Sequence, residues 1–252
     1  MLTARRWPLI ADLPMLPILL TTALAFDPTA LQARVDATRD LRSHRLAEIQ
    51  PTLPADAYTK AASGKVATGI QKVGDHSAKL GWGVGVFDAP IDAVWKALND
   101  ELHHGDLVPL SHVELVSGSA CADGRKVLMV LPLPVISDRY WVNTNRYASR
   151  LATESQGQLR ELVWDSVADP SAEALSAEGR AAVDGLVPMG FNKGAWFLVA
   201  LDETHTLAEY HSWVDPGGSV PAGAASAFAT SGIVDTFEAM GSYARAGRSH
   251  CP

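Results

Sequence analysis

Residues 206–243 decide the fold, and they read TLAEYHSWVDPGGSVPAGAASAFATSGIVDTFEAMGSY. The first nine residues have the composition and alternation of a β-strand. A turn follows at residues 215–218 (DPGG), and after Pro221 no further proline occurs until Pro252. Ser219 is the expected N-cap of a helix, with Pro221 near its first position, where a missing N–H costs nothing.

Apolar and small residues recur through this run at three- and four-residue spacing. They are Ala225, Phe228, Ala229, Gly232, Ile233, Thr236, Phe237, Met240, Gly241 and Ala244. A single stripe of this kind predicts a long helix that buries one face. A final strand followed by such a helix predicts that the helix lies across a sheet.

The composition is that of a chain with a sizeable core. The chain has 252 residues, of which 47% are hydrophobic and 19% charged, and this balance argues against wholesale disorder. The formal net charge is −7, and no basic run or interleaving of basic with aromatic residues occurs. We therefore expect no nucleic-acid partner.

The N-terminus differs from the rest of the chain. Arg5 and Arg6 precede a short apolar stretch at 13–20, and Ala23 and Ala25 form a small-x-small pattern. This order predicts a secretory signal at residues 1–25 and a periplasmic or secreted protein. The alternative is a flexible tail on a cytoplasmic protein. The apolar stretch is too short and too rich in proline for a transmembrane helix.

The two cysteines, Cys121 and Cys251, lie far apart in the sequence and belong to no Cys-x-x-Cys pattern. A structural zinc site is therefore not expected. In an oxidising compartment the two could pair, and this would tie the C-terminal tail, residues 247–252, to a loop.

Between these ends, helical and strand periodicities alternate. Amphipathic helices are expected at 28–49 with Asp27 as the cap, at 55–62, at 91–100 and, in an insertion, at 171–184. Strand patterns cover 65–73, 78–87, 111–118, 125–131, 137–150, 158–167, 186–191, 195–201 and 206–214. About nine strands with mostly short turns predict an α+β fold, in which a curved antiparallel sheet wraps around the long C-terminal helix. We expect an N-terminal helical segment at 26–63 and one domain at 64–246.

Three glycines alternate in residues 81–87 (GWGVGVF). Glycine on one face of a strand predicts either the close approach of something bulky or strong curvature. A weak edge strand is the alternative interpretation.

Three stretches carry a resemblance to a known family: residues 88–95 (DAPIDAVW), residues 132–142 (PLPVISDRYWV), and residues 210–221 with the helix that follows. From residue 64 to 246 the order of elements is similar to that of START domains, the lipid-transfer modules of the Bet v 1-like (SRPBCC) helix-grip superfamily. The resemblance implies a cavity between the sheet and the C-terminal helix that holds one lipid, often a sterol or phospholipid. It also implies transient membrane contact, and we expect a monomer.

Strand parity predicts which side chains line that cavity. On the last strand Tyr210 and Ser212 share the inward face, whereas the other face carries Glu209 and His211 and is expected to meet solvent. Matching Arg139 to the family's Arg-Asp motif places the odd-numbered residues after it inside. The candidate ligand-binding residues are Trp141, Asn143, Asn145, Trp164, Trp196, Tyr210, Ser212, Phe228, Ile233 and Phe237.

Some sterol-binding members of the family carry an inward arginine paired with an acid. Here that position falls on Asn145, with Arg146 beside it, so the sequence departs from the pattern and leaves open whether a buried ion pair is present. Neutral amides at Asn143 and Asn145 are expected to meet a lipid hydroxyl or carbonyl instead. The many small residues of the C-terminal helix predict either free volume beneath it or tight packing on the sheet.

No reactive constellation of strength occurs in the sequence. The G-x-S-x-G elbow and the phosphate-binding glycine loop are absent, and no cofactor is expected. The cluster of His103, His104 and Asp106 suggests a solvated loop more than a metal site, because adjacent residues rarely present both rings to one ion. Glu161 and Asp165 share a strand face, which is expected to be exposed.

The favoured hypothesis is a non-catalytic lipid carrier or sensor. Its gate would be the C-terminal helix or the insertion at 170–188. An enzyme on the same fold, such as a polyketide aromatase/cyclase or a small hydrolase, is the alternative, and a protein-interaction module with a collapsed cavity is a third.

Overall fold

A curved sheet forms the body of the protein. The computed structural model describes residues 26–133, 137–218, 220 and 222–252, excluding the side chains of residues 106 and 222–231. In spatial order the neighbouring strands are β1 (Ala67–Lys72), β2 (Lys79–Phe87), β9 (Thr206–Asp215), β8 (Phe191–Ala200), β6 (Leu159–Ser166), β5 (Arg139–Tyr147), β4 (Lys126–Leu131) and β3 (His112–Ser117). Each pairs antiparallel with the next, and the short β7 (Val187–Pro188) pairs parallel with β5. The prediction of an α+β fold with a mainly antiparallel sheet of about nine strands is confirmed.

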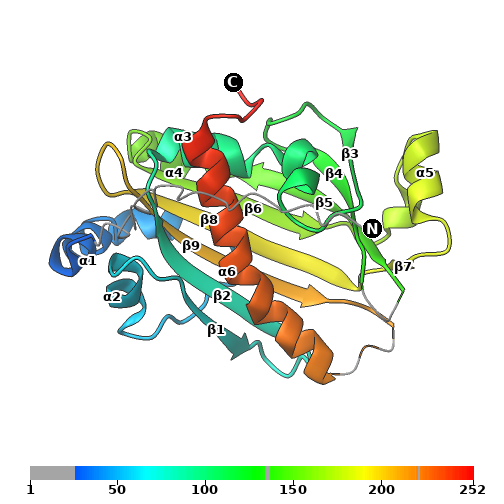
Figure 1. The fold of residues 1–252 in the computed structure, drawn as a ribbon, viewed down its shortest axis with the longest axis horizontal. Coiled ribbons are helices and arrows are strands. Elements are labelled where there is room, and N and C mark those ends of the chain that lie inside the picture. Colours follow the sequence, from blue (N-terminus) through cyan, green and yellow to red (C-terminus); the bar gives the residue numbers. More distant parts are fainter. Residues whose placement is uncertain (1–25, 134–136, 219, 221) are drawn as a thin grey trace, which may run out of the picture.

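The long helix α6 (Ala222–Ala246) lies diagonally across one face of this sheet (Figure 1). We call this face concave and the opposite one outer. In the described half of α6, the buried positions are Ile233, Phe237, Met240, Gly241, Tyr243 and Ala244. The predicted stripe is wrong at Gly232, which is exposed. Gly247, with a φ of 59°, follows the last helical residue, in a conformation that glycine adopts without strain.

The glycines of β2 allow α6 to lie close to the sheet. A Cβ built at Gly83 would come within 2.5 Å of Ile233 Cγ2, and one at Gly85 within 2.9 Å of Phe237 Cδ1. The interpretation that a bulky group approaches these glycines is therefore confirmed, and the group is the apolar face of α6.

The N-terminal segment covers the outer face of the sheet. Helix α1 (Pro28–Ala37) begins at Asp27, whose carboxylate accepts hydrogen bonds from the N–H groups of Thr29 and Ala30. The 3-10 helix η1 (Asp40–His44) and helix α2 (Ala57–Ala62) follow. The predicted cap and the second helix are confirmed, but the prediction of one helix over 28–49 is wrong, because the chain leaves α-helical geometry after Ala37.

Buried ion pairs explain why residues 38–49 do not continue helix α1. Arg42 Nη2 donates to Glu209 Oε1 at 2.7 Å, and Arg45 Nε donates to Glu161 Oε1 at 2.7 Å. Glu209, His211 and Glu161 are all less than one-tenth exposed. Burial works to raise the pKa of Glu209, but Arg42 and Arg45 outweigh it and lower that pKa. The expectations that these acids and His211 face solvent are therefore wrong, since the N-terminal segment excludes water from that face.

The insertion covers the other end of the outer face. It contains the 3-10 helix η3 (Pro170–Ala172) and helix α5 (Ala177–Val183), and Ser176 is the N-cap of α5. The prediction of one helix over 171–184 with Ser171 as its cap is therefore wrong. Leu175 and residues of α5 pack against Leu128, Tyr140 and Val142 of β4 and β5. These strand residues alternate with those of the concave face, so the insertion does not lie over the concave face, and its predicted role as a gate there is not supported.

Three further helical elements complete the described chain. They are α3 (Ile91–Leu98), the 3-10 helix η2 (Glu101–Asp106) and α4 (Ser149–Glu154), of which the last was not predicted. A disulfide joins Cys121, in the β3–β4 connection, to Cys251 in the C-terminal tail, with 5.6 Å between the Cα atoms. The pairing that the sequence left open is thus present. Among the described residues, no helix is both long and apolar enough to span a bilayer.

Candidate functional site

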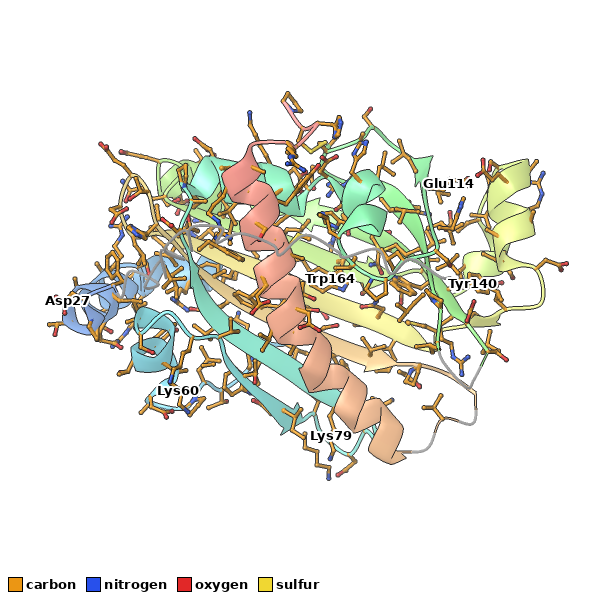
Figure 2. All side chains as sticks on the ribbon, in the orientation of Figure 1. Asp27, Lys60, Lys79, Glu114, Tyr140 and Trp164 are labelled. Carbon is orange, nitrogen blue, oxygen red and sulfur yellow. A yellow bond between two sulfur atoms is a disulfide. The ribbon has the colours of Figure 1, made fainter. Side chains whose placement is uncertain are left out.

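Strand β5 presents a row of polar and aromatic side chains to the concave face. In the sheet Asn145 lies opposite Trp164 of β6, and Asn143 lies opposite Ser166. Trp164 packs against the cluster that contains Ile233 and Phe237 of α6, so this face of β5 is the one that α6 covers. Trp164 is labelled in Figure 2, where it lies close to α6. Trp141 and Asn143 therefore point to the same side as the helix.

Two buried polar atoms in this row have no partner among the described residues. They are the indole Nε1 of Trp141 and the carboxamide Oδ1 of Asn143. Trp141 is 6% exposed and Asn143 is 4% exposed, so water does not readily reach either group. A buried polar group without a hydrogen bond costs about 1–3 kcal/mol. The residues that carry this unpaired donor and acceptor are two positions apart on the strand, so their Cα atoms are about 7 Å apart. A ligand hydroxyl or carbonyl would be stabilised at this place.

Asn145, the third member of the row, belongs to a buried ion-pair network. Its Nδ2 donates to Glu101 Oε1 at 3.0 Å, and Arg125 Nε donates to Glu101 Oε2 at 3.0 Å. Arg125 also donates through Nη2 to Asn99 Oδ1 and through Nη1 to Tyr147 Oη, both at 2.9 Å. Arg125 is 1% exposed. Burial raises the pKa of Glu101, and Arg125 works against that rise.

The buried ion pair that the sequence left in doubt is therefore present, but at another position. The arginine is not at Asn145 or Arg146 but at Arg125, directly before β4, and its acid is Glu101 in η2. Neither residue was a sequence candidate, because an arginine after a Gly124 turn has nothing local that distinguishes it from a solvated one. Every described nitrogen of this guanidinium has an acceptor, so the pair anchors η2 to the sheet.

An aromatic wall adjoins the polar row. Trp196 of β8 lies 4.5 Å from Tyr210 of β9 and 5.0 Å from Phe237 of α6, between ring centroids. Trp164 stands 5.9 Å from Tyr210, and its Nε1 donates to Asn192 Oδ1 at 2.9 Å. The apolar side of the site is thus a packed cluster that also includes Ile233.

Tyr210 and Ser212 lie on the concave face, in register with Gly83 and Gly81 of β2. Burial raises the pKa of Tyr210, and a hydrogen bond with Ser212 works in the opposite direction. The phenol therefore stays protonated at neutral pH and offers a hydrogen bond, not a negative charge. The side chain of Phe228, the remaining candidate, lies outside the described part of the chain.

The histidines that were adjacent in sequence do not converge. His104 is turned inward, with Nε2 2.9 Å from the carbonyl oxygen of Ala97, and burial lowers its pKa. His103 points instead to Asp100, with Nδ1 2.7 Å from Oδ1. The side chain of Asp106 lies outside the described residues. The expectation of a merely solvated loop is wrong for His104, which is half-buried and bonded to the backbone.

Comparison with known proteins gives a likeness of fold. No protein-family model matches the sequence, and no curated protein matches it. Among solved structures, the STAR-related lipid transfer protein from Xanthomonas axonopodis is 20% identical over 77% of this chain and 97% of its own, with a TM-score of 0.57. Human STARD10 is 13% identical, covering 83% of this chain and 79% of its own, with a TM-score of 0.56.

Human StAR-related lipid transfer protein 5 is 14% identical, covering 88% of this chain and 99% of its own, with a TM-score of 0.54. At these identities the likeness concerns the fold alone. The protein therefore has the helix-grip fold of START domains, as the three sequence stretches predicted.

Proposed function

We propose that the protein binds one lipid of the sterol or phospholipid class between the concave face of the sheet and α6, as a non-catalytic carrier or sensor. The observation that carries the proposal is the pair of buried, unpartnered polar atoms, Trp141 Nε1 and Asn143 Oδ1. A lipid hydroxyl or carbonyl can accept a hydrogen bond from the first, and a lipid hydroxyl can donate one to the second. The fold supports the proposal, because the similar structures are lipid-transfer proteins by name.

The rest of the site suits an apolar ligand. The neighbouring wall of Trp164, Trp196 and Tyr210 is aromatic, and the charged groups Arg125 and Glu101 neutralise each other. Burying apolar ligand surface contributes about 25 cal/mol per Å², so most of the affinity would come from this contact. The polar row would then fix the orientation of the lipid.

We propose that entry requires α6 to move at its N-terminal end. The other end is held by the Cys121–Cys251 disulfide and by Tyr243, whose hydroxyl donates to Asp100 Oδ2 at 2.6 Å. With that end fixed, α6 can separate from the sheet only from the Ala222 side. This proposal replaces the insertion gate, since the insertion packs on the outer face.

An extracytoplasmic location fits the disulfide, because disulfides persist mainly in oxidising compartments. The predicted signal at residues 1–25 supports the same location and lies outside the described residues. Contact with a membrane would be transient, for loading and release, and a monomer is sufficient for the mechanism.

The enzyme alternative now has one named candidate, Glu101, a buried acid whose pKa is raised by burial. Its two carboxylate oxygens accept hydrogen bonds from Arg125 and Asn145, so a substrate proton would have to compete with both. This arrangement favours the carrier. The third alternative, a protein-interaction module with a collapsed cavity, differs from the carrier in that it would take up no ligand.

The test is native mass spectrometry of the purified protein, with solvent extraction of bound material. It is followed by uptake assays with labelled cholesterol, phosphatidylcholine and palmitic acid. We expect one lipid per chain, either co-purified or taken up from one of these probes. An empty protein that takes up none of the three would refute the proposal.

A further inference from the structure

Three candidate metal ligands meet where the C-terminal tail returns to the core. Asp100 follows α3, His103 lies in η2, and His250 lies in the tail. His103 Nδ1 is 2.7 Å from Asp100 Oδ1, and His250 Nδ1 is 3.2 Å from Asp100 Oδ2. The two imidazole rings are stacked, with centroids 3.6 Å apart. Two segments that are about 150 residues apart in the chain therefore aim ring nitrogens at one carboxylate.

We propose that this cluster binds one divalent transition-metal ion of the Zn²⁺ type through His103, His250 and Asp100. Imidazole nitrogen and carboxylate oxygen are ligands that Zn²⁺ prefers, and three protein ligands leave a fourth tetrahedral position for water. This inference does not rest on lipid binding, because the concave-face row is made of other residues.

Two of the ligand distances are already close to those of an occupied site. Bonds of about 2.0–2.1 Å at tetrahedral angles separate neighbouring ligand atoms by about 3.3 Å. The two oxygen–nitrogen distances, 2.7 and 3.2 Å, lie close to that value, and all three ligand atoms lie within 4.8 Å of one another. Because the two rings are stacked at an interplanar angle of 20°, they must tilt relative to each other before both Nδ1 atoms can bind one ion.

Other groups hold the ligands in place. The side chain of Asp100 is 3% exposed, and its Oδ2 accepts from the Tyr243 hydroxyl at 2.6 Å and from the His250 N–H at 2.8 Å. Such outer hydrogen bonds orient a metal-binding carboxylate. The disulfide at Cys251 fixes the residue after His250 to the core. The side chains of His103 and His250 are 41% and 62% exposed, so an ion can reach them from solvent.

The disulfide also limits the ligand set. The sulfurs of Cys121 and Cys251 lie within 4.8 Å of an Asp100 oxygen, but while bonded to each other they offer no thiolate. Each imidazole that binds the ion through Nδ1 must release any proton held there, so binding liberates protons. In the oxidised protein the ion would replace the contacts between the rings and Asp100 and tie the tail to α3 and η2.

The experiment uses the untagged, EDTA-treated and dialysed protein without reductant. Zn²⁺ binding is measured by titration calorimetry, and Co²⁺ binding by the visible absorption of tetrahedral cobalt. The variants are His103→Gln and His250→Gln, both of which keep the disulfide. His205→Gln is the matched control, because His205 also pairs with an acid, Asp202, at 2.9 Å but has no second histidine beside it. Thermal unfolding checks that each variant is folded.

We expect one Zn²⁺ per chain, with affinity weakened at least about tenfold in both ligand variants and unchanged in the control. Three outcomes would overturn the proposal: no uptake by the wild type, an effect in fewer than both of the ligand variants, or an equal loss in the His205→Gln control. The last would identify adventitious binding to surface histidines.

Discussion

The packing of α6 against β2 gives a prediction whose size follows from the structure. Gly83→Ala would place a methyl group 2.5 Å from Ile233 Cγ2 and 2.9 Å from Phe237 Cε2, whereas carbon atoms in contact prefer about 3.5–4.0 Å. Rotating Ile233 alone leaves the second clash, so α6 must move by about 1 Å. Overpacking of this kind costs about 1–3 kcal/mol, and the reduced freedom of the unfolded chain returns about 0.4–1 kcal/mol.

We therefore expect Gly83→Ala to lower the free energy of unfolding by about 1–2 kcal/mol, measured by urea denaturation. Gly232→Ala is the matched control, since a Cβ there meets nothing within 4 Å, and it should be neutral or stabilising by up to about 1 kcal/mol. A double-mutant cycle with Ile233→Ala should show the two changes to be coupled. Additivity within about 0.5 kcal/mol would refute the flush packing of α6 on the glycines.

Three further predictions concern charge and motion. Burial and Arg45 lower the pKa of His211 to about 4 against an opposing effect of Glu209. The unfolded state therefore binds more protons between about pH 6.5 and 4, and this stability is present above pH 6.5 and lost as the pH falls. His211→Gln should reduce the difference in unfolding free energy between pH 7 and pH 4 by about 3 kcal/mol; an unchanged difference would contradict the assignment. Arg125→Met leaves Glu101 buried without its partner and should lower the free energy of unfolding in urea by about 3–5 kcal/mol. Adding Glu101→Leu should recover part of this loss. A loss below about 1 kcal/mol would show that the pair is solvated. A disulfide between Gly83→Cys and Ile233→Cys should block lipid transfer between vesicles until it is reduced, and unimpaired transfer would exclude movement of α6.

The alternation of side chains along the strands was the most informative pattern in the sequence. The alternation in 206–214 placed Tyr210 and Ser212 on one face, and the match at Arg139 placed Trp141 and Asn143 on the corresponding face of β5. The two-residue period of a strand groups these residues by face, but the inward face of β5 was chosen from the family resemblance at Arg139. The glycines at 83 and 85 likewise predicted a close approach before its partner was known.

The alternation of side chains along a strand does not show which face of the sheet is exposed to solvent. Glu209 and Glu161 were expected in solvent because nothing in their own strands shows that Arg42 and Arg45 will cover them. The same two arginines fall at helical spacing within residues 28–49, so they favoured one long helix there, although they bind acids of the sheet. The buried Arg125–Glu101 pair and the Asp100 cluster also depend on contacts between distant segments, which periodicity does not reveal.

The central claim is that a lipid meets Trp141 and Asn143 on the concave face. The most direct measurement is the ¹⁵N–¹H spectrum of the tryptophan indoles, with the Trp141 signal assigned by Trp141→Phe. The probe is whichever of cholesterol, phosphatidylcholine or palmitic acid the protein takes up. We predict that saturation shifts the Trp141 indole signal and leaves that of Trp82, on the outer face, in place. A bound lipid that leaves the Trp141 signal unmoved would contradict the account.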